Sequence, residues 1–170
     1  SRCDEASMKL VLLRHATRSP YDSGASSLST KGRAQSEDLV AQIAPHGPLP
    51  VPTRLLVSPK RRAKETLTPL SQALHLPLET EIRLDERRQN ETAPEFHSRI
   101  VSLFAELEAD PKNGECVYLC THLDWLETAM IEMNHDLSDL DASLGWSTAE
   151  FKVFRYEDGT WKTKAKGQIP

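Results

Sequence analysis

The sequence predicts an α/β fold, a three-layer α/β/α sandwich with a mostly parallel sheet and an antiparallel edge strand. Short apolar runs, typical of strands buried on both faces, alternate with longer segments of helical periodicity. Near the end of the chain, "EDG" separates two strand-like runs and indicates a hairpin, which places antiparallel pairing at one edge. The 170 residues fit one domain. We assign it to residues 8–170 and expect residues 1–7 to be a tag remnant or a short native extension.

Local signals predict the elements in order. We expect strands at 9–14, 54–58, 116–121, 150–156 and 160–165, an extended segment at 76–84, and helices at about 30–44, 58–75, 93–109 and 123–134. Ser29 and Thr30 can cap the first helix, and Pro59 suits the first turn of the second. Pro69 lies inside that second helix and should kink or divide it. The third helix has Phe96, Ile100 and further apolar residues at amphipathic spacing.

Charge and cysteine content exclude several classes of protein. The formal net charge of -4 argues against a general nucleic-acid binder, which usually presents a basic face to phosphates. No apolar stretch approaches the roughly 20 residues that span a bilayer, so we expect no membrane partner. The three cysteines have no metal-site or disulfide spacing, and Cys116 and Cys120 fit the core of a strand. This cysteine pattern suits a reducing, cytoplasmic location.

Cationic and imidazole side chains follow three of the predicted strands. Ligands of open α/β sheets bind at the carboxyl ends of the strands. The first strand ends in Arg14 and His15, the second leads to Arg62 one turn into a helix, and a later strand leads to His122. Taken singly, each has an ordinary explanation, a core histidine or an arginine on a solvated helix face. Together they suit a phosphoryl group, since guanidinium groups pair with phosphate oxygens and neutral imidazole can attack phosphorus.

Several segments around these residues resemble a known family. "LLRHA", "SPKRRAKET" and "LCTHLDWLETAM" are similar to signature segments of the histidine phosphatase superfamily, also called the phosphoglycerate mutase-like family. "LSTKGRAQSEDL" and "APEFHSRIVSLF", a helix with a central arginine, extend the resemblance over most of residues 9–156. It implies a phosphoglycerate mutase-like fold and a hydrolase that forms a phosphohistidine intermediate without a metal or cofactor.

The resemblance also implies roles for single residues. His15 would be the phosphorylated nucleophile, with Arg14, Arg62 and His122 binding the transferring phosphoryl group. We expect one His15 nitrogen to donate to a backbone carbonyl, which would fix the tautomer. "RHATRSP" is similar to the R-H-G-x-R-x-P version found in the acid phosphatase and phytase branch, which would make Arg18 a further phosphate ligand. The chain departs from the family in having Ala16 where glycine is usual.

Two carboxylic acids are candidates for the general acid that protonates the leaving group. "RLDERRQNE" resembles a segment whose glutamate is the proton donor, which makes Glu86 the first candidate. Asp124, near the start of a predicted helix, is the alternative, although there it could equally be a residue that satisfies the helix dipole.

These residues are compatible with more than one function. The leading hypothesis is a phosphatase for phosphomonoesters, and the alternative is a phosphohistidine or phosphoprotein phosphatase of the SixA type, which could work without a carboxylic acid because imidazole is a good leaving group. A phosphomutase and a catalytically silent phospho-ligand binding module are further alternatives. The expected partner is a phosphorylated small molecule or a phosphoprotein, and the sequence gives no oligomeric state.

Overall fold

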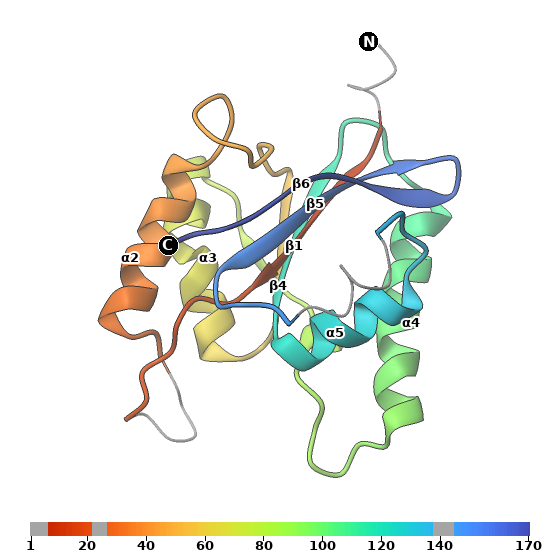
Figure 1. The fold of residues 1–170 in the computed structure, drawn as a ribbon, viewed down its shortest axis with the longest axis horizontal. Helices are drawn as coiled ribbons and strands as arrows, with labels where there is room; N and C mark the ends of the chain where they lie inside the picture. Colours follow the sequence, from red (N-terminus) through yellow and green to blue (C-terminus); the bar gives the residue numbers. More distant parts are fainter. Residues whose placement is uncertain (1–6, 22–26, 138–144) are drawn as a thin grey trace.

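A computed structural model describes residues 7–21, 27–137 and 145–170, and its strands form one sheet in the order β3-β2-β4-β1-β5-β6 (Figure 1). The strands are β1 (Lys9–Arg14), β2 (Arg54–Val57), β3 (Leu78–Thr80), β4 (Cys116–Thr121), β5 (Glu150–Glu157) and β6 (Thr160–Gln168). The helices are α2 (Thr30–Ala41), α3 (Arg61–Leu74), the 3-10 turn η1 (Ile82–Leu84), α4 (Ala93–Ala109) and α5 (Leu123–Glu132). The extension expected at residues 1–7 lies almost wholly outside the described residues, and the assignment of one domain stays a prediction.

The sheet is parallel on one side and antiparallel on the other. Strands β3, β2, β4 and β1 run parallel, whereas β5 pairs antiparallel with β1 and β6 antiparallel with β5. The turn between β5 and β6 contains Asp158 (φ 52°) and Gly159 (φ 75°), the left-handed pair that a tight hairpin requires. The mixed sheet and the hairpin are therefore as predicted, with two strands instead of one on the antiparallel side.

Helices cover both faces of the sheet, as the three-layer prediction requires. Helices α2 and α3 pack on one face, where Leu39, Leu67 and Leu70 join a core with alternate residues of β1. Helices α4 and α5 cover the other face, on which Phe104 and Trp125 contribute to a second core. Every residue of β4 is buried, as expected for a strand in the middle of such a sandwich. Among the described residues, no helix is long and apolar enough to cross a membrane.

Helix α3 begins later than predicted, and of the two effects expected of Pro69, a kink or a division, division of the helix does not occur. It begins at Arg61 with Lys60 as its N-cap, so Pro59 precedes the helix instead of occupying its first turn. It also continues through Pro69 without being divided. An internal proline costs about 3 kcal/mol. Leu67 and Leu70, on either side of it, are fully buried, and burying each such side chain stabilises by about 1.5–3 kcal/mol. Packing therefore offsets the lost hydrogen bond.

The segment predicted to be extended over 76–84 contains only the short strand β3 and then turns. The carboxylate of Glu81 accepts a hydrogen bond from the backbone N–H of Arg83, which starts the 3-10 turn η1. This turn buries Leu84 and directs the next residues towards the carboxyl ends of the strands. The predicted helix ends also shift inwards, because α2 ends at Ala41 and α5 at Glu132.

Candidate active site

The ends of β1 and β4 bring two histidines together. These strands are parallel neighbours in which Arg14 pairs with Thr121, and the N–H of His15 donates to the Thr121 carbonyl at 3.0 Å. The next residue on each strand is therefore a histidine at the same edge. The rings of His15 and His122 lie 5.3 Å apart between centroids, with an angle of 59° between their planes.

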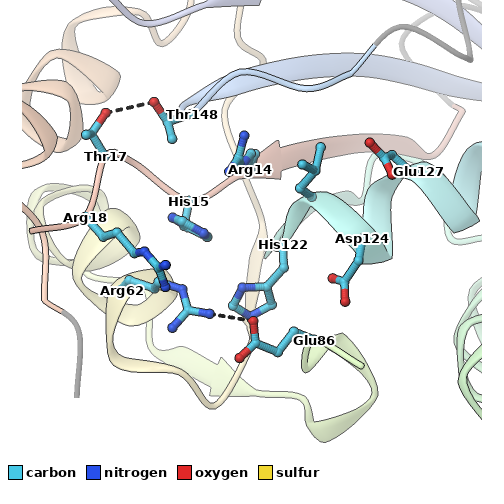
Figure 2. Close-up of a pocket in the computed structure, with 11 residues that line it drawn as sticks. Arg14, His15, Thr17, Arg18, Arg62, Glu86, His122, Asp124, Glu127 and Thr148 are labelled. Atoms are coloured by element: carbon cyan, nitrogen blue, oxygen red, sulfur yellow. Dashed lines mark hydrogen bonds and ion pairs between the residues drawn. The ribbon is translucent and has the colours of Figure 1, made fainter. Parts of the chain in front are cut away.

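An open pocket of about 370 Å³ lies at this edge of the sheet (Figure 2). Its lining comprises Arg14, His15, Thr17, Arg18, Arg62, Glu86, His122, Leu123, Asp124, Glu127 and Thr148. Every residue predicted from the sequence is among them, so the structure brings the whole predicted set together. The described residues contain no group of three or more histidine, cysteine or acidic side chains that could hold a metal ion.

His15 is held as a neutral imidazole. Its Nδ1 lies 2.8 Å from the carbonyl oxygen of Ala16, so Nδ1 carries the proton and Nε2 keeps the lone pair, as the sequence analysis expected. The side chain is buried, with 5% of its surface exposed. Burial, followed by the positive charges of Arg62 and Arg14, lowers the pKa of His15 to about 4. The imidazole is therefore unprotonated and nucleophilic at neutral pH.

His122 is also neutral, but it is oriented by a hydroxyl. Its Nε2 lies 2.7 Å from Ser58 Oγ, which also accepts a hydrogen bond from the N–H of Lys60. The Ser58 proton is thus available for Nε2, and the ring proton then sits on Nδ1. Nδ1 is buried and has no hydrogen-bond partner among the described residues. Burial and the charge of Arg62 lower the pKa of His122 to about 2, so Nδ1 can serve as an uncharged donor.

Two arginines present unused donors beside these rings. Arg62 is 7% exposed, and its Nη2 donates to Glu86 Oε2 at 2.7 Å. Arg14 is half-buried and donates from Nη1 to the carbonyl oxygen of Trp146 at 2.5 Å. The Nε atoms of both arginines are buried and have no partner among the described residues. Burial and the neighbouring Arg18 lower the pKa of Arg14, which is the electrostatic signature of a site that an anion would stabilise.

Arg18 lies at the mouth of the pocket. It is exposed, and Figure 2 shows its guanidinium group beside that of Arg62. Its charge contributes to the lowered pKa values of both Arg14 and His15. Arg18 is thus placed to meet the outer part of a bound anion, in contrast to the two buried arginines.

The two candidate acids differ in how their oxygens are used. Glu86 pairs with Arg62 through Oε2, its Oε1 lies 3.9 Å from Lys60 Nζ, and its side chain is 39% exposed at the pocket. Asp124 uses both oxygens on backbone, because Oδ1 accepts from the N–H of Trp125 at 2.8 Å and Oδ2 from the N–H of Arg87 at 2.9 Å. Asp124 therefore binds a backbone N–H in the first turn of α5 and ties this helix to the loop that carries Glu86. The Glu86 carboxyl is instead directed at the pocket (Figure 2).

The loop after His15 is fixed by residues of α2 and α3. The N–H of Ala16 donates to Thr66 Oγ1 and that of Thr17 to Gln35 Oε1, both at 2.9 Å. Gly32 lies so close that a Cβ there would be 1.9 Å from the Thr17 carbonyl oxygen. Glycine and glutamine of "LSTKGRAQ" thus act on the site through the backbone that follows the nucleophile.

Four lining residues were not predicted. Glu127 lies one helical turn after Asp124, so a helical-face argument could have found it. Thr17 and Leu123 adjoin predicted residues. Thr148 comes from the segment before β5, and its hydroxyl lies 2.8 Å from that of Thr17. No motif marks Thr148, because only the tertiary fold brings it there.

Comparison with known proteins agrees with this geometry. The model of the histidine phosphatase superfamily (branch 1) matches residues 10–92, a range that includes Arg14, His15, Arg62 and Glu86. This part of the chain, just under half of its length, is thus similar to the histidine phosphatase superfamily. A search of curated proteins by sequence finds no significant match.

Solved structures with the same fold include several phosphatases. A protein from Escherichia coli K-12 assigned as an alpha-ribazole-5'-P phosphatase superposes with a TM-score of 0.77 at 14% identity, over 96% of this chain and 97% of that one. A mycobacterial glucosyl-3-phosphoglycerate phosphatase gives 0.68 at 18% identity, over 94% and 98%. The protein histidine phosphatase SixA, complexed with tungstate, gives 0.69 at 18% identity, over 95% and 97%. These likenesses establish the phosphoglycerate mutase-like fold.

Proposed function

We propose that this chain is a histidine phosphatase that hydrolyses phosphomonoesters through a phosphohistidine on His15. The observation that carries the proposal is a neutral imidazole between two arginines with unpaired, buried donor atoms. Leaving such donor atoms buried without partners is costly unless an anion completes the site. Arg14, Arg62 and the Nδ1–H of His122 would hold the phosphoryl oxygens, with Arg18 as an outer ligand, so the charge stabilisation needs no metal or cofactor.

In the first step, the lone pair on His15 Nε2 attacks phosphorus as the bond to the ester oxygen breaks. Glu86 donates its proton to that oxygen, and an alcohol leaves. The backbone contact at Nδ1 stabilises the positive charge that develops on the ring. In the second step, ionised Glu86 takes a proton from water while the oxygen attacks phosphorus. The N–P bond breaks, its electrons return to Nε2, and inorganic phosphate leaves.

Glu86 fits the acid role better than Asp124. The bound phosphoryl group competes with Glu86 for Arg62, which frees the carboxyl to face the leaving oxygen. Asp124 would have to give up a backbone hydrogen bond at the oxygen that carries the proton before it could donate that proton. We therefore assign Asp124 to holding the loop.

The substrate is a phosphorylated small molecule or a phosphoprotein, and an ester is the first candidate because the pocket holds a carboxylic acid. The similar structures include both a small-molecule phosphatase and SixA, so a phosphohistidine phosphatase is the second. A phosphomutase would need to retain the phosphoryl group, which an open pocket does not favour. We also propose a cytoplasmic location, because Cys116 and Cys120 are buried free thiols.

Rapid quenching with labelled substrate tests the nucleophile. The wild type should hold acid-labile phosphate on His15, and His15→Ala should hold none and lose turnover. The same experiment separates a phosphatase from a binding module, since absence of both label and turnover with an activated aryl phosphate would favour the latter.

Glu86→Gln distinguishes the two substrate classes. For an alkyl phosphate we expect kcat to fall by about 10²- to 10⁴-fold, because the alkoxide then leaves without a proton. For a phosphohistidine peptide the loss should stay below about 10-fold, since imidazole is a better leaving group. Equal residual activity on both substrates would contradict the ester phosphatase.

A further inference from the structure

The loop that carries Glu86 is held along its backbone by side chains from other elements. Each carbonyl from Arg83 to Glu86 accepts at least one hydrogen bond from such a donor. The bonds run from Arg99 Nη1 to the oxygens of Arg83 (2.8 Å) and Asp85 (2.6 Å), from Arg99 Nη2 to that of Glu86 (2.9 Å), from Trp125 Nε1 to that of Arg83 (2.6 Å), and from Thr121 Oγ1 to that of Leu84 (2.6 Å). Arg99 supplies three of these five bonds.

The side chain of Arg99 is itself held in place by neighbouring residues. It lies in the middle of α4, with only 12% of its side chain exposed, and its guanidinium group sits 4.7 Å from the centre of the Phe96 ring. It forms a bidentate ion pair with Glu91, in which Nε donates to Oε2 at 2.7 Å and Nη2 donates to Oε1 at 2.9 Å. Glu91 lies at the far end of the same loop and also accepts the N–H of Arg88 on Oε1. The pair with Arg99 lowers the pKa of Glu91 to about 2, so both partners stay charged.

We propose that Arg99, locked by Glu91, is the positioning residue for the general acid: it holds the backbone of Glu86 so that the carboxyl meets the leaving oxygen. The proposal rests on the proposed function, because it assumes that Glu86 is the acid. Arg99 does not line the pocket, so it acts only through the loop. Its bond to the Glu86 carbonyl is the most direct link, since it fixes the residue whose side chain donates the proton.

The contact pattern separates this role from general stabilisation. A misplacement of about 1 Å at a reacting group can cost about 10²-fold in rate. The phosphate ligands Arg14, Arg62 and His122 come from other elements and should keep their positions when Arg99 changes. Loss of Arg99 should therefore reduce proton donation while leaving phosphate binding intact. A leaving group that needs no proton would hide the defect.

The experiment compares an alkyl phosphate, O-phosphoethanolamine, with p-nitrophenyl phosphate, whose leaving group is stable without a proton. In Arg99→Met, kcat for the alkyl ester should fall about 10²-fold. With the aryl ester it should fall less than about 3-fold, and KM for both should change little. Arg99→Lys, which keeps one charge but cannot reach three carbonyls, should give an intermediate loss of the same kind. Glu86→Gln combined with Arg99→Met should be no slower on the alkyl ester than Glu86→Gln alone.

Arg83→Met is the matched control. This arginine is on the same segment, but its side chain binds Glu81, Ser102 and Glu106, so kcat for both esters should stay within about 2-fold of wild type. Thermal unfolding checks that each variant is folded, and if Arg99→Met unfolds, Arg99→Lys and Glu91→Gln carry the comparison. Equal losses on the two esters, or a change mainly in KM, would overturn the proposal. Failure of the proposed function looks different, because the wild type would then hydrolyse neither ester.

Discussion

The pocket has two walls of opposite charge, and the side chains of the two walls differ in how far they are buried. The cationic wall consists of Arg14, Arg18 and Arg62, and the acidic wall of Glu86, Asp124 and Glu127 (Figure 2). Arg62 is buried in the first turn of α3, and Arg14 is half-buried at the end of the central strand β1. Glu86 is more than one-third exposed, and Glu127 is exposed on α5. Arg18 alone among the cations resembles the acids in its exposure.

This difference in depth separates two tasks. In the proposed mechanism, the more buried arginines would recognise the phosphoryl group, which all substrates share. The more exposed carboxylates on the loop and on α5 would meet the leaving group, by which substrates differ. Changes in the cationic wall should therefore lower activity on every substrate alike, whereas changes in the acidic wall should alter the ratio between substrates.

The largest effect should follow from Arg62→Met. Arg62 can give two charge-assisted hydrogen bonds to the phosphoryl group, each worth about 1.5–3 kcal/mol, so kcat/KM should fall by about 10³-fold on alkyl and aryl phosphates alike. Steady-state kinetics on both substrates measure this. Arg18→Met, on the exposed side of the same wall, should cost less than about 10-fold. Arg61→Met, beside Arg62 but paired with Glu65, should change nothing. A loss confined to one substrate would contradict the division between the walls.

The cationic wall should also keep His15 neutral in moderately acidic solution. With a pKa of about 4, the imidazole is about nine-tenths neutral at pH 5, where an ordinary histidine is almost fully protonated. Titration of the ring nitrogens by NMR should give a midpoint near 4 and, at higher pH, a protonated Nδ1. Arg62→Met should raise the midpoint because one positive charge is removed. A wild-type midpoint near 6.5 would contradict the assignment.

The same pKa shift has a consequence for stability. The unfolded chain binds a proton at His15 more readily than the folded one, so the free energy of unfolding should fall as the pH drops from about 6.5 to about 4. Denaturant unfolding at several pH values measures this loss. In His15→Phe, which is never protonated there, the loss should be smaller than in wild type.

Most of the fold could be predicted because its signals are local. Alternating apolar runs and helical periodicity gave β1, β4 and α4 with their observed ends. The errors fall where tertiary packing overrides local preference. Pro69 is tolerated because buried leucines flank it, and the segment before Glu86 turns because Glu81 meets the N–H of Arg83.

The site could be predicted in so far as its reactive side chains follow the ends of predicted strands. His15 and His122 follow two parallel neighbours, so their proximity follows from topology. The contacts that set their behaviour could not be predicted in the same way. The bond from the N–H of Arg87 to Asp124 and the bonds from Arg99 to the loop that carries Glu86 join residues 13 or more positions apart, and no local pattern encodes such bonds.

The acidic wall yields the smallest effect, a preference among leaving groups. Glu127 is exposed at the pocket, one turn after Asp124, and a carboxylate cannot itself be a ligand of phosphate. O-phosphoethanolamine and phosphoglycolate are matched in size and carry opposite charges at the far end. An exposed charge pair is worth about 0.5 kcal/mol, and here it is attractive for phosphoethanolamine and repulsive for phosphoglycolate. Wild type should therefore favour phosphoethanolamine by about 5-fold in kcat/KM.

Glu127→Gln should reduce this preference towards unity, and Glu127→Lys should reverse it, while activity on p-nitrophenyl phosphate stays within about 2-fold. Glu132→Gln is the control, because this residue ends the same helix and pairs with His97 outside the pocket. A ratio unchanged by both Glu127 substitutions would assign the acidic wall to holding the loop alone, and leaving-group choice would then depend on Glu86. A ratio that follows the charge at position 127 would mean that recognition of the phosphoryl group and of the leaving group can be altered separately in this pocket.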